Sequence, residues 1–175
     1  MSYFSIISNN DLGIWYRTIY WTKPSRIMQA WADGTNEVEI VSGFDPRGIA
    51  VDYKSSKLYW ADWWDGVVQS SGLDGSNVQT LVSEPYVSAI AVDENRVYYG
   101  NWHWEVPPVM RSCNKTGGDV KTLYTGDSTT KYTLMSHLAL MSPHAPETGR
   151  RNECEDQICD GICVLTPSSY RCLSF

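Results

Sequence analysis

Apolar positions in this chain fall in short runs that end at turn residues, which is typical of β-strands. The run Ile49-Ala50-Val51 is wholly apolar and predicts a strand buried on both faces. A second kind of run carries a Tyr-Trp pair, and a third, such as 67–70, alternates apolar with polar positions. A fourth has the polar and apolar alternation of an outer strand. No stretch has a convincing helical period, so we expect an all-β fold.

These runs recur in the same order along the chain. The runs with the aromatic pair begin 39 residues apart, at Ile19, Leu58 and Val97. Asp-Gly pairs mark tight turns between the third and fourth runs, because glycine takes a positive φ without strain. Short strands at even spacing, repeated about every 40 residues, predict β-propeller blades. We therefore expect three four-stranded blades.

The repeat resembles the YWTD blades of the low-density lipoprotein receptor family over roughly residues 3 to 141. The resemblance implies that the acid of the motif helps to tie neighbouring blades. Only Asp62 retains that acid, because Lys23 and Asn101 replace it in the other two copies, so two ties must differ. The resemblance rests on Tyr20-Trp21-Thr22, Tyr59-Trp60-Ala61-Asp62-Trp63, Leu73-Asp74-Gly75-Ser76-Asn77 and the Ile-Ala-Val-Asp runs, with Leu138-Ala139-Leu140-Met141 similar to a final inner strand.

The tail concentrates four of the five cysteines, namely Cys154, Cys159, Cys163 and Cys172. This density predicts a disulfide framework and an oxidising compartment, whereas zinc is less favoured because the tail has no C-x2-C pair and no nearby histidine. The tail resembles a truncated EGF-like module, with Ser174 where a fifth cysteine is expected. That resemblance implies Cys154–Cys163 and Cys159–Cys172 pairing, and Arg150 argues against calcium. The predicted domains are 1–145, the YWTD-type blades, and 146–175, the truncated EGF-like module.

Three blades are half of the six-bladed propeller that the resemblance implies. An open half exposes strand edges, and closed two-fold dimers are the commonest oligomers. We therefore expect a homodimer that completes six blades. The chain is expected to be a complete small protein, with a fragment of a larger lipoprotein-receptor-like protein as the alternative.

Charge and hydropathy argue against nucleic acid and membranes as partners. The formal net charge is −6, the pI is about 5.0, and no Lys/Arg cluster exceeds Arg150-Arg151. This excludes nucleic acid as an expected partner and disfavours an anionic membrane surface. No apolar run approaches the roughly 20 residues of a membrane span, so no membrane insertion is expected. With the tail cysteines, this predicts a secreted, extracellular protein, although no signal peptide is visible.

The candidate catalytic groups have simpler structural explanations. His103, His137 and His144 lack a metal-ligand spacing, and no serine lies in a nucleophile elbow. Asp52 and Asp93 follow the inner runs in register, which favours turn capping over a general acid and base pair. We predict no enzyme, no cofactor and no metal.

Tryptophans in two predicted turns favour ligand binding. These turns share one face of the blades with the loops that enter the inner strands. Trp63 has a counterpart in the family motif and favours packing, whereas Trp64, Trp102 and Trp104 fit inter-blade packing or ligand contact equally well. The ligand is a protein, or a glycan if the chain is a soluble lectin with Trp-lined sugar sites. The candidate ligand-binding residues are Trp63, Trp64, Asp65, Asn101, Trp102, His103, Trp104 and Glu105.

Two residues of the third blade suggest covalent chemistry. Cys113 has no partner in the tail and is either a free thiol or an intermolecular disulfide. The second choice would suit an extracellular matrix or scaffold protein. Asn114-Lys115-Thr116 is an N-glycosylation acceptor pattern in a predicted surface turn.

Overall fold

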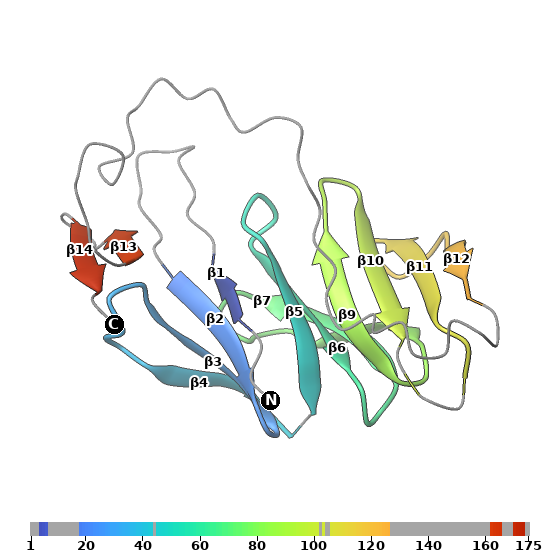
Figure 1. Ribbon diagram of the computed structural model, residues 1–175, viewed down its shortest axis with the longest axis horizontal. Coiled ribbons are helices and arrows are strands. Elements are labelled where there is room, and N and C mark those ends of the chain that lie inside the picture. The colour runs from blue at the N-terminus through green and yellow to red at the C-terminus, as the bar shows by residue number, and fades with distance from the viewer. Residues whose placement is uncertain are drawn as a thin grey trace.

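The computed structural model describes residues 4–6, 18–43, 45–101, 103, 106–126, 162–165 and 170–173. These residues form strands and turns, arranged as three four-stranded antiparallel sheets and one hairpin. In each of the three sheets the strands follow chain order (Figure 1). The predicted all-β fold with three propeller blades is confirmed. Among the described residues, no helix is long and apolar enough to cross a membrane.

Each sheet contains one copy of the sequence repeat. Blade 1 comprises β1 (Phe4–Ile6), β2 (Thr18–Lys23), β3 (Arg26–Trp31) and β4 (Val38–Ser42). Blade 2 comprises β5 (Pro46–Asp52), β6 (Lys57–Asp62), β7 (Val67–Gly72) and β8 (Gln79–Ser83). Blade 3 comprises β9 (Val87–Val92), β10 (Arg96–Asn101), β11 (Val109–Asn114) and β12 (Lys121–Thr125).

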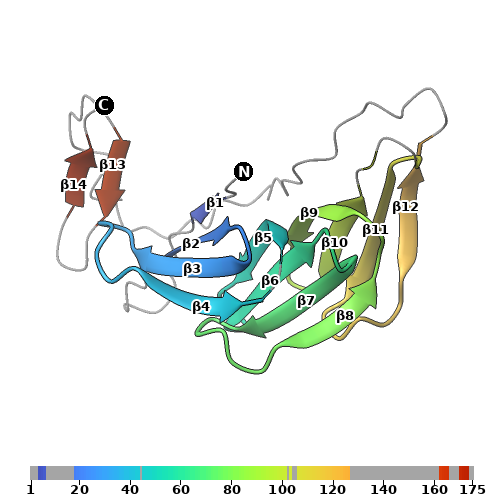
Figure 2. The same cartoon turned by 90° about the horizontal axis from the view of Figure 1, so that it is seen from below.

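The sheets fan out side by side, with β1, β5 and β9 inside and β4, β8 and β12 on the outer rim (Figure 2). The apolar runs account for this placement, since Ile49, Ala50 and Val51 of β5 are all buried. Residue Gly48 allows β5 to approach β9 closely, because an added Cβ would lie 2.8 Å from the Ser88 carbonyl oxygen. Burial on both faces therefore selects the inner position for these strands.

The core lies between successive blades. Tyr20, Ile27 and Val41 of blade 1 join Leu58 and Trp60 of blade 2 in one buried cluster. A second cluster repeats this arrangement between blades 2 and 3, with Tyr59, Val68, Val97, Tyr99 and Cys113 among its members. The side chains of one sheet face thus pack against the next blade, as side chains do between stacked sheets.

The tail contributes one described hairpin, β13 (Ile162–Leu165) with β14 (Tyr170–Leu173). Its backbone register pairs Cys163 with Cys172. Cys154 and Cys159 lie outside the described residues, as do Leu138–Met141 and Arg150. The EGF-like module, its two disulfides and the 1–145/146–175 boundary therefore remain predictions.

An ion pair links blade 3 to blade 2 at the end of β5. The Lys115 ammonium donates to Asp52, whose side chain is nearly buried. Burial alone would raise the pKa of Asp52, but hydrogen bonds from Lys115 and Ser55 outweigh it and lower the pKa. Asp93, at the same position of blade 3, accepts hydrogen bonds from the backbone N–H groups of Asn95 and Arg96. These contacts agree with the capping role predicted for both carboxylates.

Replacing Asp52 tests this ion pair. A carboxyl whose pKa is lowered by folding stabilises the protein above its ordinary pKa, and this stability is lost as pH falls through the folded value. We expect Asp52→Asn to lower the free energy of unfolding by about 1–2 kcal/mol at pH 7. The deficit should shrink as the pH falls below about 4. Urea unfolding at several pH values measures it, and Glu37→Gln, in the exposed pair with Lys23, serves as a control with an effect under about 0.5 kcal/mol. A deficit independent of pH would contradict the electrostatic explanation.

Candidate functional site

The turn after β6 carries two of the candidate tryptophans, and Asp62 holds this turn in place. The Asp62 side chain is 0% exposed. Its Oδ2 accepts the Asp45 N–H at 2.7 Å and its Oδ1 accepts the Asp65 N–H at 2.9 Å. Burial raises the pKa of this carboxyl, while the two backbone hydrogen bonds oppose that rise. Asp62 therefore braces the turn and the loop that leads from blade 1 into blade 2.

Aromatic rings from blades 2 and 3 meet beside this turn. The Trp63 ring centroid lies 5.6 Å from that of Tyr86 and 6.3 Å from that of His103. The Tyr86 and His103 rings stack at 3.9 Å with an interplanar angle of 18°. The Arg47 guanidinium carbon lies 4.0 Å from the Trp63 ring centroid, a cation–π geometry. We call Arg47, Trp63, Trp64, Tyr86 and His103 the aromatic cluster.

Trp64 is the exposed member of the aromatic cluster. Its side chain is 78% exposed, and its ring centroid lies 6.4 Å from that of Trp63. The adjacent Asp65 is also exposed. A tryptophan so exposed loses the favourable burial of a large apolar surface, which in folded proteins often marks an interaction site. Of the two readings left open for Trp64, packing between blades does not fit this exposure.

Sequence reasoning found the tryptophan turn and missed Arg47 and Tyr86. Arg47 is the second residue of β5 and Tyr86 directly precedes β9, so both lie where an inner strand begins, on the face of the turn after β6. Tyr86 has a φ of 60°, a backbone conformation that is strained for a bulky residue. The position of these two residues on the predicted ligand face was the available signal, although nothing in the local pattern set them apart.

Asn101, a predicted ligand contact, is assigned a different role by the structure. The side chain is only 6% exposed, and its Oδ1 accepts the Val109 N–H at 2.7 Å. It occupies in β10 the position that Asp62 has in β6, and it links the end of β10 to the start of β11. At the same position of blade 1, Lys23 forms an exposed ion pair with Glu37 at 2.6 Å. The contacts of Asn101 and Lys23 each lie within one blade, whereas Asp62 also accepts a backbone N–H from the loop before β5. The altered ties between blades at these two positions therefore remain a prediction.

The remaining predicted site residues divide into described and undescribed ones. Trp102, Trp104 and Glu105 lie outside the described residues. Cys113 is a free thiol, 0% exposed, and burial raises its pKa. A disulfide to a second chain would require this part of the core to open.

Asn114 is the last residue of β11 and begins the turn that leads to β12. Its Oδ1 accepts hydrogen bonds from the N–H groups of Thr116 at 3.0 Å and Gly118 at 2.8 Å. The carboxamide oxygen therefore orders the turn in which the glycosylation pattern lies. Glycosylation at Asn114 remains a prediction.

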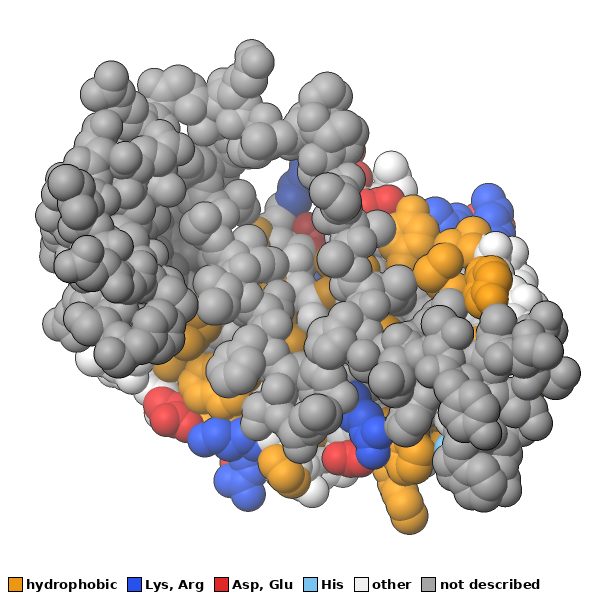
Figure 3. Space-filling view, in the orientation of Figure 1, with side chains coloured by type: hydrophobic (Ala, Val, Ile, Leu, Met, Phe, Trp, Pro, Cys, Tyr) orange, Lys and Arg blue, Asp and Glu red, His pale blue; other side chains and the backbone are white. Residues whose placement is uncertain are grey.

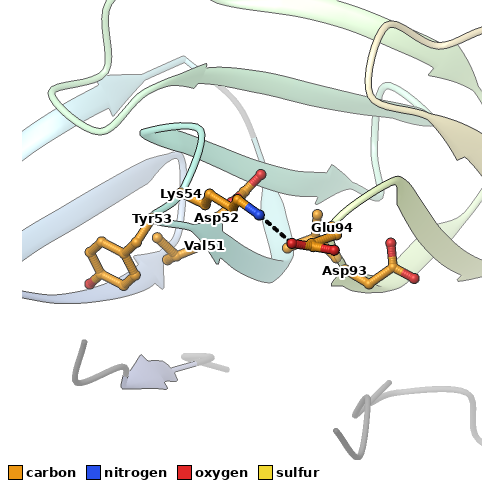
Figure 4. Close-up of a pocket in the computed structure, with 7 residues that line it drawn as sticks. Val51, Asp52, Tyr53, Lys54, Asp93 and Glu94 are labelled. Carbon is orange, nitrogen blue, oxygen red and sulfur yellow. Dashed lines mark hydrogen bonds and ion pairs between the residues drawn. The ribbon is translucent and has the colours of Figure 1, made fainter. Parts of the chain in front are cut away.

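A shallow cavity of about 220 Å³ lies at the opposite ends of the inner strands (Figure 4). Its polar lining includes Asp52, Lys54, Asp93 and Glu94, and the Lys54 ammonium pairs with Glu94 across it. Asp52 and Asp93 are occupied by the contacts described above. Within the described ranges, no group of three or more His, Cys, Asp or Glu side chains could hold a metal ion.

The fold and the site define a protein of propeller blades that carries the aromatic cluster on its loop face. Comparison with known proteins identifies relatives of this chain. Human low-density lipoprotein receptor-related protein 5 is 30% identical over 87% of this chain, and the vitellogenin receptor of Solenopsis invicta is 27% identical over 73%. A solved structure, the nidogen/laminin complex, matches with a TM-score of 0.59 at 21% identity, covering 63% of this chain and 44% of the matched chain. No protein-family profile matches the chain.

These similarities support the YWTD repeats of the low-density lipoprotein receptor family as the relatives of this chain. The structural match shows the propeller-blade fold. The chain spans 9% of the length of the human receptor and 7% of the vitellogenin receptor. What the whole relatives do is therefore carried over only as a proposal.

Proposed function

We propose that this chain is a non-catalytic, extracellular ligand-binding protein whose contact surface is the aromatic cluster. The observation that carries the proposal is Trp64, 78% exposed at the edge of a base formed by Trp63, Tyr86 and His103. The Asp62 carboxylate fixes the turn that carries Trp63 and Trp64, and the Arg47 guanidinium packs over the Trp63 ring. An exposed anchor on a rigid base loses little conformational entropy when it binds.

The cluster suits a protein ligand. Tryptophan, tyrosine and arginine are the residues most enriched among binding hot spots, and the cluster combines all three. The two relatives reported above carry the word receptor in their names, which is consistent with binding. The ligand surface that fits is an apolar or aromatic side chain, placed against Trp64, with polar neighbours toward Asp65. The sequence candidates Trp102, Trp104 and Glu105, which lie outside the described residues, belong to the same proposal.

A glycan ligand is the second candidate. The exposed Trp64 ring lies next to the exposed Asp65 carboxylate. Tryptophan faces stack on the apolar faces of sugar rings while carboxylates accept hydrogen bonds from hydroxyl groups. The chain would then be a soluble lectin.

The proposed working unit is two chains that complete six blades. It presents two copies of the aromatic cluster, one from each chain, and gains avidity for ligands that carry repeated epitopes. The truncated EGF-like module at 146–175 and glycosylation at Asn114 belong to the same proposal of an extracellular protein.

Replacement of Trp64 tests the binding function. Peptides selected from a display library on the wild-type chain, together with a glycan array, supply the probes. We expect Trp64→Ala to weaken the per-chain affinity of a selected probe at least about 30-fold in calorimetry, because a central aromatic anchor typically contributes 2 kcal/mol or more. The melting temperature should stay unchanged, since the ring is exposed.

Val78→Ala is the matched control. Val78 is also exposed but lies before β8, at the opposite end of blade 2 from the turn after β6. Its removal should leave the per-chain affinity within about 2-fold. Equal losses in the two variants would contradict a site at the aromatic cluster. Capture of peptides alone supports the protein ligand, and competable sugar binding alone selects the lectin.

A further inference from the structure

The turn between the third and fourth strands has the same geometry in all three blades. The central glycine N–H donates to the carbonyl oxygen three residues earlier, at 2.8 Å for Gly34 and 3.0 Å for Gly75 and Gly117. The φ angles of the three glycines are 81°, 81° and 89°. Blade 1 therefore carries the same turn as the other two.

In blades 2 and 3 this turn packs closely against the outer strand of the preceding blade. A Cβ at Gly75 would lie 1.9 Å from the carbonyl oxygen of Ile40 in β4. A Cβ at Gly117 would lie 2.1 Å from the carbonyl oxygen of Leu81 in β8. Ile40 and Leu81 occupy the same position, at the irregularity where the fourth strand pairs with the third. Each inter-blade joint thus includes a glycine turn seated on an outer-strand carbonyl.

Among the described residues, the two halves of this joint lie without a partner at the two ends of the three blades. Blade 1 carries the glycine turn, and blade 3 carries the outer-strand carbonyl. At Gly34 an added Cβ would meet no atom within 4 Å. At the other end, Leu123 of β12 occupies the position of Ile40 and Leu81. Its side chain is 48% exposed, and that of Tyr124 is 40% exposed.

Among the described residues, no further blade packs against β12, and this accounts for its exposure. All five residues of β12 are exposed, whereas Val41 of β4 is buried and Leu81 and Val82 of β8 are half-buried. Hydrophobic side chains gather at the surface along the side formed by β10, β11 and β12 (Figure 3). An outer strand of this kind is buried in part wherever a following blade covers it.

We propose that the Gly34 turn of one chain seats on β12 of a second copy, over the Leu123 carbonyl. The chain carries both halves of the joint, and two chains related by a two-fold axis form two such joints with no half left over. This inference rests on the two-chain assembly proposed above and names its contact. Trp21, Met28 and Ala30 on the same side of blade 1 are already buried within the chain. The new contact therefore lies at the outer rim, where Trp31 is 45% exposed.

Gly34→Ala tests the joint, with Gly43→Ala as the matched control. Gly43 also has a positive φ, 86°, and no atom within 4 Å of an added Cβ, but it lies in the loop before β5. Both variants carry similar backbone strain, so only the Gly34 variant adds a methyl group at the proposed contact. In sedimentation analysis across micromolar concentrations, we expect Gly34→Ala to raise the dimer dissociation constant at least about 10-fold over that of Gly43→Ala.

A second variant addresses the other half of the joint. Leu123→Asp places a carboxylate on exposed β12 and should weaken the dimer by at least the same factor, because it buries an unpaired charge. Val78→Asp, at an exposed position before β8, is its control and should leave the dimer unchanged. Circular dichroism melts show that each variant is folded.

The outcomes separate this inference from the binding function. A dimer that Gly34→Ala weakens no more than Gly43→Ala does would overturn the joint and leave the two-chain assembly standing. A wild-type chain that is monomeric throughout would overturn both. In either case Trp64-dependent binding is measured per chain, so it stands or fails independently.

Discussion

Gly75→Ala is expected to cost about 3–5 kcal/mol of the free energy of unfolding. The new Cβ would lie 1.9 Å from the Ile40 carbonyl oxygen and 2.7 Å from its carbonyl carbon, which are backbone atoms that no rotamer change can move. The φ of 81° adds about 1 kcal/mol of strain for any residue with a Cβ. Since small domains are stable by about 5–15 kcal/mol, this change consumes a large share of the total. Urea or thermal unfolding followed by tryptophan fluorescence measures it.

Gly34→Ala is the internal control for that measurement. Gly34 has the same φ of 81° and the same turn hydrogen bond, but no atom lies within 4 Å of its added Cβ. Measured at concentrations where the chain is monomeric, it reports backbone strain alone, about 1 kcal/mol. The difference between the variants is therefore the contact between blades 1 and 2. Equal losses would contradict the seating of the Gly75 turn on β4.

The blades were predictable because the apolar runs, the aromatic pairs and the turn residues of the sequence all indicate the same strands. The apolar run at 49–51 and the Tyr-Trp runs repeat at one spacing, and the structure pairs them in register, with Tyr59 opposite Ala50 and Ser70. What the sequence could not show is the seating of Gly75 and Gly117 on neighbouring carbonyls. Positive φ values were predicted for turn glycines, but a close approach between blades depends on tertiary packing.

The candidate site was predictable in part. The turn at Trp63 and Trp64 was identified because paired tryptophans in a loop are rarely solvent-exposed without reason. Arg47 and Tyr86 join the site only through folding, since the loops into β5 and β9 meet the turn after β6 in space. Asn101 illustrates the converse, because a polar residue next to a candidate loop has its amide oxygen occupied by a backbone N–H. The residue type and its position in the sequence therefore do not distinguish a ligand contact from a residue that stabilises a loop.

Asp62→Ala is expected to cost about 2–4 kcal/mol and to disorder the turn that carries the aromatic cluster. The substitution leaves the N–H groups of Asp45 and Asp65 without their side-chain acceptor, and each lost partner of these part-buried hydrogen bonds costs about 1–2 kcal/mol. Chemical denaturation gives the free energy. The fluorescence of Trp63 and Trp64 should change, because their spacing depends on this turn.

Asp62→Asn separates the acceptor role of this residue from its charge. At the same position of blade 3, the Asn101 amide oxygen accepts one backbone N–H, that of Val109, so an amide can serve as a buried acceptor there. Burial raises the pKa of Asp62 in the folded state, and the ionised carboxyl therefore weakens stability as pH rises from its ordinary pKa toward the folded value. Asp62→Asn removes this dependence and keeps one acceptor, so its cost at pH 7 should be about 1 kcal/mol, well below that of Asp62→Ala. Equal costs for the two variants would mean that the charge, rather than the acceptor oxygens, holds the turn.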